Sequence, residues 1–134
     1  MDRVGIVRSA YEAFSRGDLE GALASMSADV VWHQAQGLPH GGVYHGLEAV
    51  RSAVFAPLAR DWWSAFDATA EELIDGGDHV VALGRYTGKA RSTGLPLDVP
   101  FAHVWTFAGD SVVRFVQFVD TAGWNAALAP SPDG

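Results

Sequence analysis

The order of apolar and polar residues divides the chain into a helical first part and a strand-rich second part. Apolar residues recur every three or four positions in residues 4–14 and again in residues 19–26, which predicts two amphipathic helices. Between them, Gly17 is typical of the residue that follows a helix, and Asp18 of the cap of the next one. The β-branched and aromatic run Val30–His33 then predicts a strand.

A glycine-rich segment follows this strand. Residues 35–46 contain four glycines and one proline, which predicts a loop long enough to form the rim of a pocket. From Leu47 onward the apolar spacing predicts a third helix. Pro57 is expected to bend or break it, because proline lacks the N–H donor of a helical residue.

The second part of the chain predicts an antiparallel meander that ends in a short helix over residues 121–128. The expected strands cover residues 66–74, 79–87, 97–107 and 112–119. With 134 residues the chain is the size of one domain, expected over 1–134 with a flexible tail at 129–134. The element order predicts an α+β fold, in which a curved antiparallel sheet wraps around three to four helices as a cone with an internal cavity.

Composition narrows the possible functions. A net charge of −7 disfavours nucleic-acid and anionic-membrane surfaces, and no apolar run is long enough to span a bilayer. The chain has no cysteine, which excludes disulfides and thiol chemistry. We therefore expect a soluble, cytoplasmic protein. Five Trp, seven Phe and three Tyr either fill the core or line a cavity for an apolar ligand.

Four segments together resemble the ketosteroid-isomerase-like, SnoaL-like superfamily, an α+β cone fold. These segments read VRSAYEAFSRGDLEGALASMSADVVWH, GVYHGLEAVRSAV, ELIDGGDHVVALGRYTG and TGLPLDVPFAHVWTFAGDSVVRFVQFVDT. The resemblance covers roughly residues 3–128 and implies the fold more specifically than the function. Members of the superfamily include isomerases, cyclases, epoxide hydrolases, dehydratases and proteins without catalytic activity.

One face of the strand over residues 97–107 carries a histidine between two large rings. Because strand residues alternate between faces, Phe101, His103 and Trp105 share one face. The resemblance places His103 where ketosteroid isomerases carry the acid that hydrogen-bonds the substrate oxygen. His103 is therefore a candidate donor to a carbonyl or enolate, and its alternative role is that of a hydrogen-bonded core histidine.

Asp120 ends the last strand and is the candidate proton-transfer residue. Polyketide cyclases of the superfamily carry an acid–base aspartate at a similar position, and apolar neighbours would raise the pKa of such a carboxyl. The alternative is that Asp120 caps the helix that begins at Thr121. The two roles are compatible.

Several further residues are candidate ligand contacts or departures from the family pattern. Arg85 resembles the epoxide-hydrolase arginine, but Gln117 and Thr87 stand where that chemistry needs acids, so epoxide hydrolysis is disfavoured. Arg85 is then either a ligand contact or a solvent-facing charge. The isomerase base falls near Gln34, which cannot act as a base, and His33 next to it points the other way along a strand.

The aromatic candidates Tyr11 and Trp32 are expected to line the cavity, Tyr11 with a hydroxyl that reaches a ligand or is satisfied in the core. His40 and His45 are the closest histidine pair, but the spacing matches no zinc motif, and we expect neither metal nor cofactor.

The leading hypothesis is a cavity that binds a compact apolar or polycyclic carbonyl ligand. It includes cofactor-free isomerase, cyclase or dehydratase chemistry by Asp120 and His103. The expected ligand contacts are Tyr11, Trp32, Arg85, Phe101, Trp105 and Gln117. The alternative is a binding module or dimeric scaffold without catalysis. For the catalytic cavity and for the binding module alike, we expect a homodimer through the outer sheet face, with Val104, Thr106 and Phe118.

Overall fold

A computed structural model describes residues 2–129; residue 1 and residues 130–134, which hold most of the expected tail, lie outside the described residues. The helical elements are α1 (Arg3–Ser15), α2 (Leu19–Leu23), α3 (Leu47–Ala49), η1 (Val50–Phe55), η2 (Leu58–Trp62) and α4 (Thr121–Leu128). The strands are β1 (Met26–Gln34), β2 (Gly42–His45), β3 (Trp63–Gly76), β4 (His79–Ala90), β5 (Pro96–Ala108) and β6 (Ser111–Val119). In the described part of the chain, no helix combines the length and the apolar character that crossing a membrane requires.

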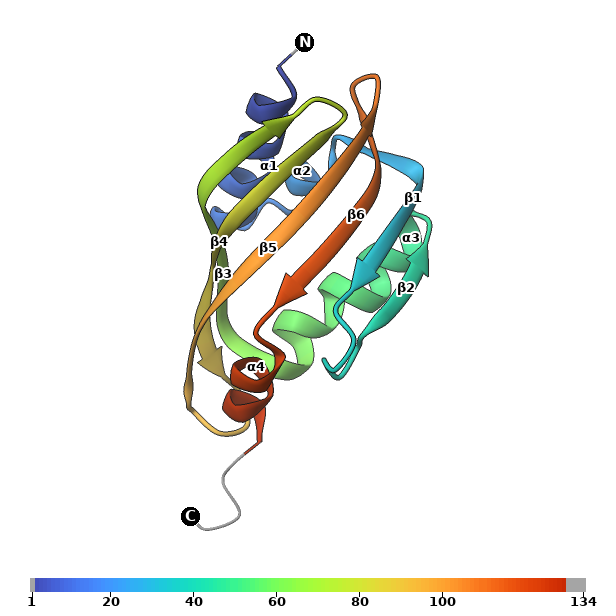
Figure 1. Cartoon of the computed structure of the whole chain (residues 1–134). Coiled ribbons are helices and arrows are strands. Elements are labelled where there is room, and N and C mark those ends of the chain that lie inside the picture. Colours follow the sequence, from blue (N-terminus) through green and yellow to red (C-terminus); the bar gives the residue numbers. More distant parts are fainter. Residues whose placement is uncertain (1, 130–134) are drawn as a thin grey trace.

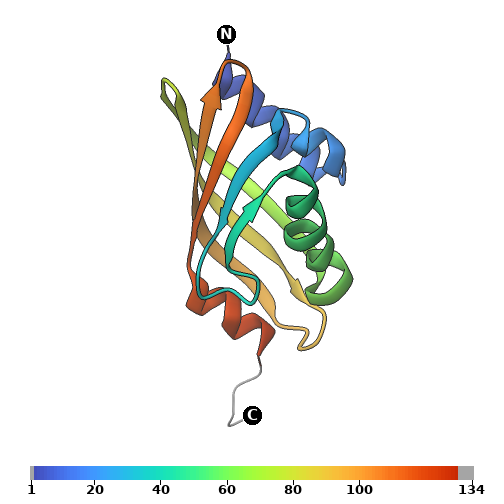
Figure 2. The same ribbon diagram turned by 90° about the vertical axis from the view of Figure 1, so that its right-hand side faces the viewer.

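The six strands form one curved sheet in the order β2-β1-β6-β5-β4-β3. Figures 1 and 2 show α1, α2 and the helical segment from α3 to η2 on one face of this sheet, with α4 across its lower end. The buried aromatic and aliphatic side chains lie between the sheet and these helices. The α+β cone expected from the sequence is confirmed.

One of the strand pairings differs from the expected antiparallel arrangement. β1 runs parallel to β6, with Trp32 beside Phe115, whereas the other neighbours in the sheet are antiparallel. The segment predicted as a loop also contains the edge strand β2, which pairs with β1. Its four residues include a glycine and are too few to show a clear alternation, so the sequence gives little sign of a strand there.

The first two helices begin where the sequence indicates, and the second ends earlier than predicted. The carboxylate of Asp2 accepts a hydrogen bond from the N–H of Gly5, and that of Asp18 from the N–H of Gly21, so each caps the helix that follows. Between the helices, Gly17 has a φ of 82°, a left-handed conformation that glycine adopts without a steric cost. Met26, expected on the second helix, instead begins β1.

The third helix continues through Pro57 instead of breaking there. After α3 its turns widen to the π-helical form in η1 and η2, where each N–H bonds five residues back. Val50, Val54 and Leu58 are all buried, and their uniform spacing of four suits this wider turn. The sequence predicted that Pro57 would bend or break the helix, and the helical turns on both sides of it show that the helix does not break there.

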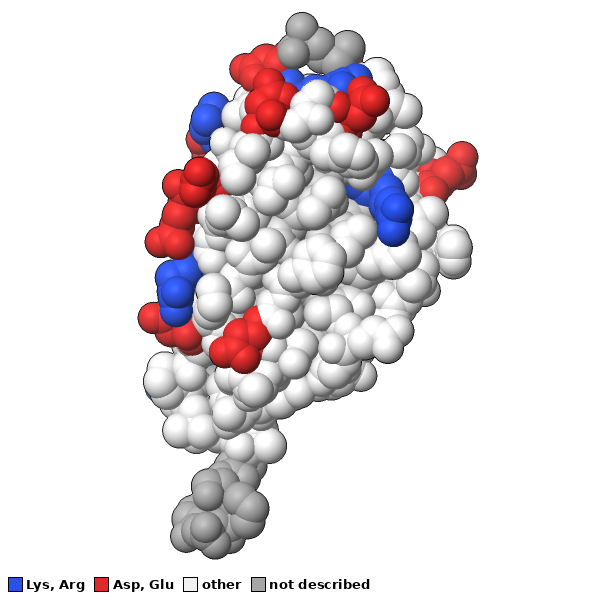
Figure 3. Space-filling model, viewed as in Figure 1, with Lys and Arg blue, Asp and Glu red and all other residues white. Residues whose placement is uncertain are grey.

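The outer face of the sheet is apolar at its centre. Two rows of paired side chains cross β4, β5 and β6, and all six are partly exposed or exposed. These outer-face residues are Val81, Val104, Val116, Leu83, Ala102 and Phe118. Figure 3 views this face and shows a broad surface without Lys, Arg, Asp or Glu, with the charged side chains toward its edges.

Candidate functional site

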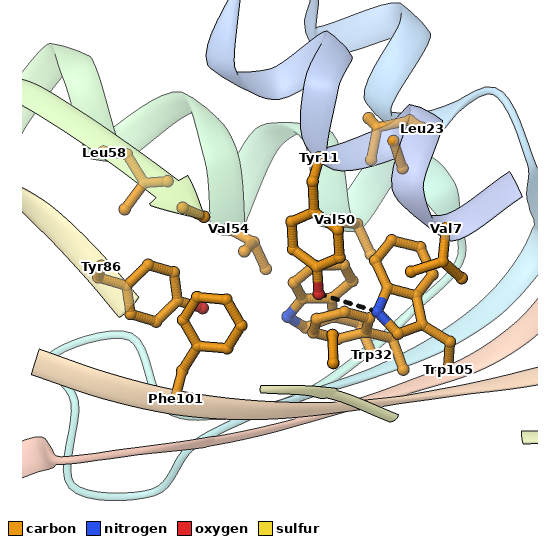
Figure 4. Packing of buried hydrophobic residues seen from close by; sticks show 14 of the residues in the cluster. Val7, Tyr11, Leu23, Trp32, Val50, Val54, Leu58, Tyr86, Phe101 and Trp105 are labelled. Carbon is orange, nitrogen blue, oxygen red and sulfur yellow. Dashed lines mark hydrogen bonds between the residues drawn. The ribbon is translucent and has the colours of Figure 1, made fainter. Parts of the chain in front are cut away.

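A small cavity lies between the concave face of the sheet and the helices. Its volume is about 60 Å³, and side chains from α1, α2, β1, η1, η2, α4 and the inner face of β3–β6 line it. Most of these side chains are apolar, and Figure 4 shows part of this packing. The polar side chains that line it are Tyr11, Gln34, Tyr86, His103 and Gln117, together with the indole groups of Trp32, Trp105 and Trp124.

His103 lies at the centre of the polar part of the cavity. The alternation predicted for β5 is confirmed: Phe101, His103 and Trp105 are buried, whereas the residues between them are partly exposed. The Phe101 ring stacks on the imidazole with 3.9 Å between ring centroids. A Cβ atom on Gly84 would overlap that ring, so glycine on β4 leaves the space that Phe101 needs to hold His103 in place.

Two tyrosine hydroxyls contact the two nitrogens of this imidazole. The Tyr11 hydroxyl oxygen lies 2.6 Å from Nδ1, and the Tyr86 hydroxyl oxygen lies 2.5 Å from Nε2. Tyr11 comes from α1 and Tyr86 from β4, and Figure 4 shows their hydroxyl groups pointing into the same space from opposite sides. We call these three side chains the Tyr–His–Tyr chain.

Each tyrosine oxygen also accepts a hydrogen bond from a fixed donor. The indole N–H of Trp105 donates to Tyr11 over 3.0 Å. The amide nitrogen of Gln117 donates to Tyr86 over 2.7 Å. The orientation of this amide is determined, because its oxygen accepts the backbone N–H of Ala35.

Burial keeps all three groups of the chain neutral at physiological pH. It lowers the pKa of His103 to about 3 and raises the pKa of Tyr11 and of Tyr86 above the usual tyrosine value. A neutral imidazole has one N–H and one free nitrogen lone pair. One tyrosine therefore donates to His103, and the other accepts from it.

This arrangement leaves one hydroxyl hydrogen without an acceptor in the chain. The tyrosine oxygen that accepts the N–H of His103 also accepts a second hydrogen bond, from Trp105 in the case of Tyr11 or from Gln117 in the case of Tyr86. The hydrogen of that hydroxyl must therefore point elsewhere. Both tyrosine side chains line the cavity. The site can therefore donate one hydrogen bond to an oxygen atom inside the cavity.

A second histidine is held in one tautomer next to this site. The amide oxygen of Gln34 accepts from the indole of Trp32 over 2.7 Å, so its nitrogen donates to Nε2 of His40 over 2.8 Å. The proton of His40 then resides on Nδ1, which has no hydrogen-bond partner within residues 2–129. Burial lowers the pKa of His40 to about 4.

Most of the candidate ligand contacts line the cavity. Tyr11, Trp32, His103, Trp105 and Gln117 do so, in agreement with the faces inferred from strand alternation. Phe101 is buried beside them but packs on His103 and Tyr86 and is not part of the cavity wall.

Two further candidates lie outside the cavity, and each takes the alternative role that the sequence left open. Asp120 is exposed, and its carboxylate accepts the N–H of Gly123 over 3.1 Å, so it caps α4. Arg85 lies on the opposite face of β4 from Tyr86 and pairs with Asp98 over 2.6 Å. The structure therefore does not bring Asp120 together with His103, because the strand ends and α4 begins at that residue.

The sequence interpretation missed Tyr86 and Trp124. Tyr86 shares its face of β4 with Val80, Ala82 and Gly84. This alternation, in which small side chains share a face with one large ring, could have identified Tyr86 as a buried residue. Trp124 lies on α4, and its indole N–H has no hydrogen-bond partner in the described part of the chain. Nothing in the local sequence indicates that α4 reaches the cavity.

An apolar depression adjoins the cavity. It has a volume of about 250 Å³ and lies between α1, the η1–η2 segment and β3. Four residues line both spaces and form the partition between them: Phe14, Phe55, Leu58 and Phe66. The partition consists of side chains only, three of which are phenyl rings.

Comparisons with known proteins agree with this architecture. The model of the SnoaL-like domain family matches residues 7–115. An NTF2-like protein from Burkholderia thailandensis E264 is 31% identical, with a TM-score of 0.89 over 96% of this chain and 98% of that one. None of the curated proteins compared with the chain matches it.

Two more distant structures share the fold. TerC, co-crystallised with polyporic acid, is 23% identical, with a TM-score of 0.85 over 96% of this chain and 98% of that one. A protein proposed to be a SnoaL-like polyketide cyclase, from Jannaschia sp. CCS1, is 18% identical, with a TM-score of 0.77 over 98% of this chain and 92% of that one. From the family match and the cone fold together, we conclude that the chain belongs to the SnoaL-like domain family.

Proposed function

We propose that the cavity binds a compact apolar or aromatic ligand through a carbonyl oxygen, and that the Tyr–His–Tyr chain carries out cofactor-free acid–base chemistry on that ligand. The observation that carries this proposal is the set of hydrogen-bond contacts around Tyr11, His103 and Tyr86, which leaves one hydroxyl hydrogen without an acceptor. A buried donor without an acceptor is costly, by about 1–3 kcal/mol, and a ligand oxygen removes that cost. Apolar walls favour the rest of such a ligand.

The ligand oxygen must be a hydrogen-bond acceptor, because the groups that the cavity wall offers are hydrogen-bond donors. In addition to the surplus hydroxyl, the cavity wall carries the unpartnered indole N–H of Trp124. None of the described lining residues carries a charge at neutral pH, so the site suits a neutral carbonyl better than a carboxylate. The co-crystallisation of TerC, a protein of the same fold, with polyporic acid is in keeping with an oxygen-bearing ligand.

The size of the cavity limits how much of the ligand it holds. A volume of about 60 Å³ is well below the roughly 150 Å³ of a cavity that admits benzene. The oxygen-bearing edge of a ring therefore occupies the inner cavity, and the remainder enters the apolar depression when the side chains of the partition rotate aside. Asp120 has no part in this scheme, since its carboxylate lies outside the cavity.

Two isosteric probes test the proposed hydrogen bond. Acetophenone and α-methylstyrene differ only in a carbonyl oxygen against a methylene group. We expect acetophenone to bind about tenfold more tightly, since one hydrogen bond contributes about 1.4 kcal/mol. Titration followed by the NMR signals of the tryptophan indole N–H groups measures both affinities.

Removing both hydroxyl groups should abolish this discrimination. The double variant Tyr11→Phe with Tyr86→Phe keeps the rings and leaves no hydroxyl to donate, so the two probes should bind equally. Tyr44→Phe is the matched control, because the Tyr44 hydroxyl donates to the His40 carbonyl and does not line the cavity. Equal affinity of the two probes for the unmodified protein contradicts the proposal, as does failure of both to bind.

We further propose that two copies of the chain associate through the outer-face residues, with Val104 and Phe118 near the centre. A face without charges lets two molecules of net charge −7 approach each other, and an apolar patch is self-complementary across a twofold axis. Phe118→Asp places a carboxylate from each copy in this interface and should convert a dimer to a monomer. Light scattering during size-exclusion chromatography measures the mass, and a monomeric unmodified protein contradicts the proposal.

A further inference from the structure

The Tyr–His–Tyr chain has two equivalent hydrogen-bonding states. In the first, Tyr11 donates to Nδ1, Nε2–H donates to Tyr86, and the Tyr86 hydroxyl hydrogen is in surplus. In the second, Tyr86 donates to Nε2, Nδ1–H donates to Tyr11, and the Tyr11 hydrogen is in surplus. Each state makes the same two contacts to His103, of 2.6 and 2.5 Å.

The surroundings do not select one of these states. Each tyrosine oxygen receives a donor from outside the chain, Trp105 on one side and Gln117 on the other, in both states. A carboxylate next to one nitrogen would fix the tautomer, but none of the described acidic side chains lies in the cavity wall. The first and second states therefore differ only in which hydroxyl can donate into the cavity.

We propose that the chain is a proton relay, which accepts a proton from a ligand at one tyrosine oxygen and delivers a proton to the same ligand from the other. This inference rests on the proposed function, because it assumes a ligand that lies between the two hydroxyl groups. It assigns a reaction class: tautomerisation, in which one molecule loses a proton at one atom and gains one at another.

The transfer balances without a cofactor or a change in net charge. Starting in the first state, the Tyr86 hydroxyl gives its proton to the ligand oxygen and receives the Nε2 proton of His103. Nδ1 receives the proton of Tyr11, and Tyr11 receives a proton from a carbon of the ligand. The electron pair of that C–H bond forms the C=C bond of the enol, and the carbonyl π pair binds the new O–H proton.

The neutrality of the chain defines the class of substrate. A neutral hydroxyl backed by an imidazole is a weak base, so the C–H bond must already be acidic. A carbon between two carbonyl groups meets this requirement, and so we assign 1,3-dicarbonyl compounds as the substrate class. After one turnover the protein is in the second state, from which the reverse transfer or exchange with solvent restores the first.

The tautomer of His103 tests the relay without any ligand. Long-range ¹H–¹⁵N NMR of the labelled protein distinguishes a protonated ring nitrogen from an unprotonated one. In the unmodified protein we expect both nitrogens to have intermediate shifts, because the two states exchange. A single tautomer would overturn the relay, even if the acetophenone discrimination of the proposed function is observed.

The two single tyrosine variants should trap opposite tautomers. In Tyr11→Phe, Tyr86 still donates to Nε2, which places the proton on Nδ1. In Tyr86→Phe, Tyr11 donates to Nδ1, which places it on Nε2. The disfavoured form leaves an additional buried group unpaired, so we expect at least about a tenfold excess of the stated tautomer in each variant. The same tautomer in both variants overturns the proposal.

A kinetic measurement tests the assigned reaction. Benzoylacetone is a 1,3-dicarbonyl whose enol absorbs in the ultraviolet, and its relaxation after dilution into buffer reports the rate of tautomerisation. We expect each tyrosine variant to lose about 100-fold in the protein-dependent rate and the double variant to lose no more, because the residues act as a unit. Tyr44→Phe should retain the rate. No acceleration by the unmodified protein, or an additive loss, overturns the assignment.

Discussion

Lowering the pH from about 7.5 to about 5.0 is expected to reduce the free energy of unfolding by about 2 kcal/mol through His103 alone. Burial lowers the pKa of this imidazole to about 3 in the folded protein, against about 6.5 in the unfolded chain. Below pH 6.5 the unfolded chain binds a proton that the folded protein does not. Stability is therefore complete above pH 6.5 and falls by about 1.4 kcal/mol per pH unit until the folded histidine is itself protonated.

Urea unfolding at the two pH values measures this effect. In His103→Gln the amide keeps polar contacts with both tyrosines but does not titrate, so the variant should lose about 2 kcal/mol less than the unmodified protein. His40, with a pKa of about 4, adds a loss of similar size and the same sign down to pH 5.0, and this loss is common to the unmodified protein and the His103→Gln variant. His79→Gln is the matched control, because it makes the same replacement at an exposed histidine. If His103→Gln shows the same pH dependence as the unmodified protein, His103 is not buried in the neutral form.

Replacing Phe115 by alanine is expected to destabilise the protein by about 3–5 kcal/mol, the usual cost of removing a buried phenyl ring. Phe115 is 2% exposed, and its ring stacks on Trp32 with 3.8 Å between centroids. It also contacts the ring of His103, with 4.7 Å between centroids. Removal of the ring leaves a space that the surrounding sheet cannot fill. Thermal or urea unfolding measures the resulting loss of stability.

Phe118 on the same strand is the matched control. It is 58% exposed on the outer face, so Phe118→Ala should change the stability of a single copy by less than about 0.5 kcal/mol. Any larger loss should depend on protein concentration, since this residue lies in the proposed dimer interface. The effect of Phe115→Ala should be independent of concentration, and similar losses for both variants would contradict the assignment of the two faces.

The sequence predicts the cone fold because its signals are local and repeated. The cap at Asp18, the turn glycine Gly17 and the alternation along β5 each act over a few residues, and the structure contains them where expected. The same alternation placed His103 on the buried face. Where geometry departs from the regular form, as in the widened helix around Pro57, local rules gave the wrong expectation.

The composition of the site was less predictable, because it depends on contacts between distant segments. Tyr11 and His103 meet only because α1 packs against the same face of the sheet that carries His103, and no spacing along the chain encodes that distance. For Asp120 the role that local sequence predicts is the one that the structure contains. Its role as a helix cap follows from its neighbours, whereas a place in the cavity rested on the family resemblance alone.

The parallel pairing of β1 with β6 affects how the protein reaches its native state. The strands from β3 to β6 join their neighbours through short connections, but β1 cannot form its pairing with β6 until β6 has been made. The hydrogen bonds of Tyr11 span 92 and 94 residues. Such long separations slow folding, typically to the millisecond-to-second range, and a nascent chain that ends before β6 lacks the surface on which its first strand must dock.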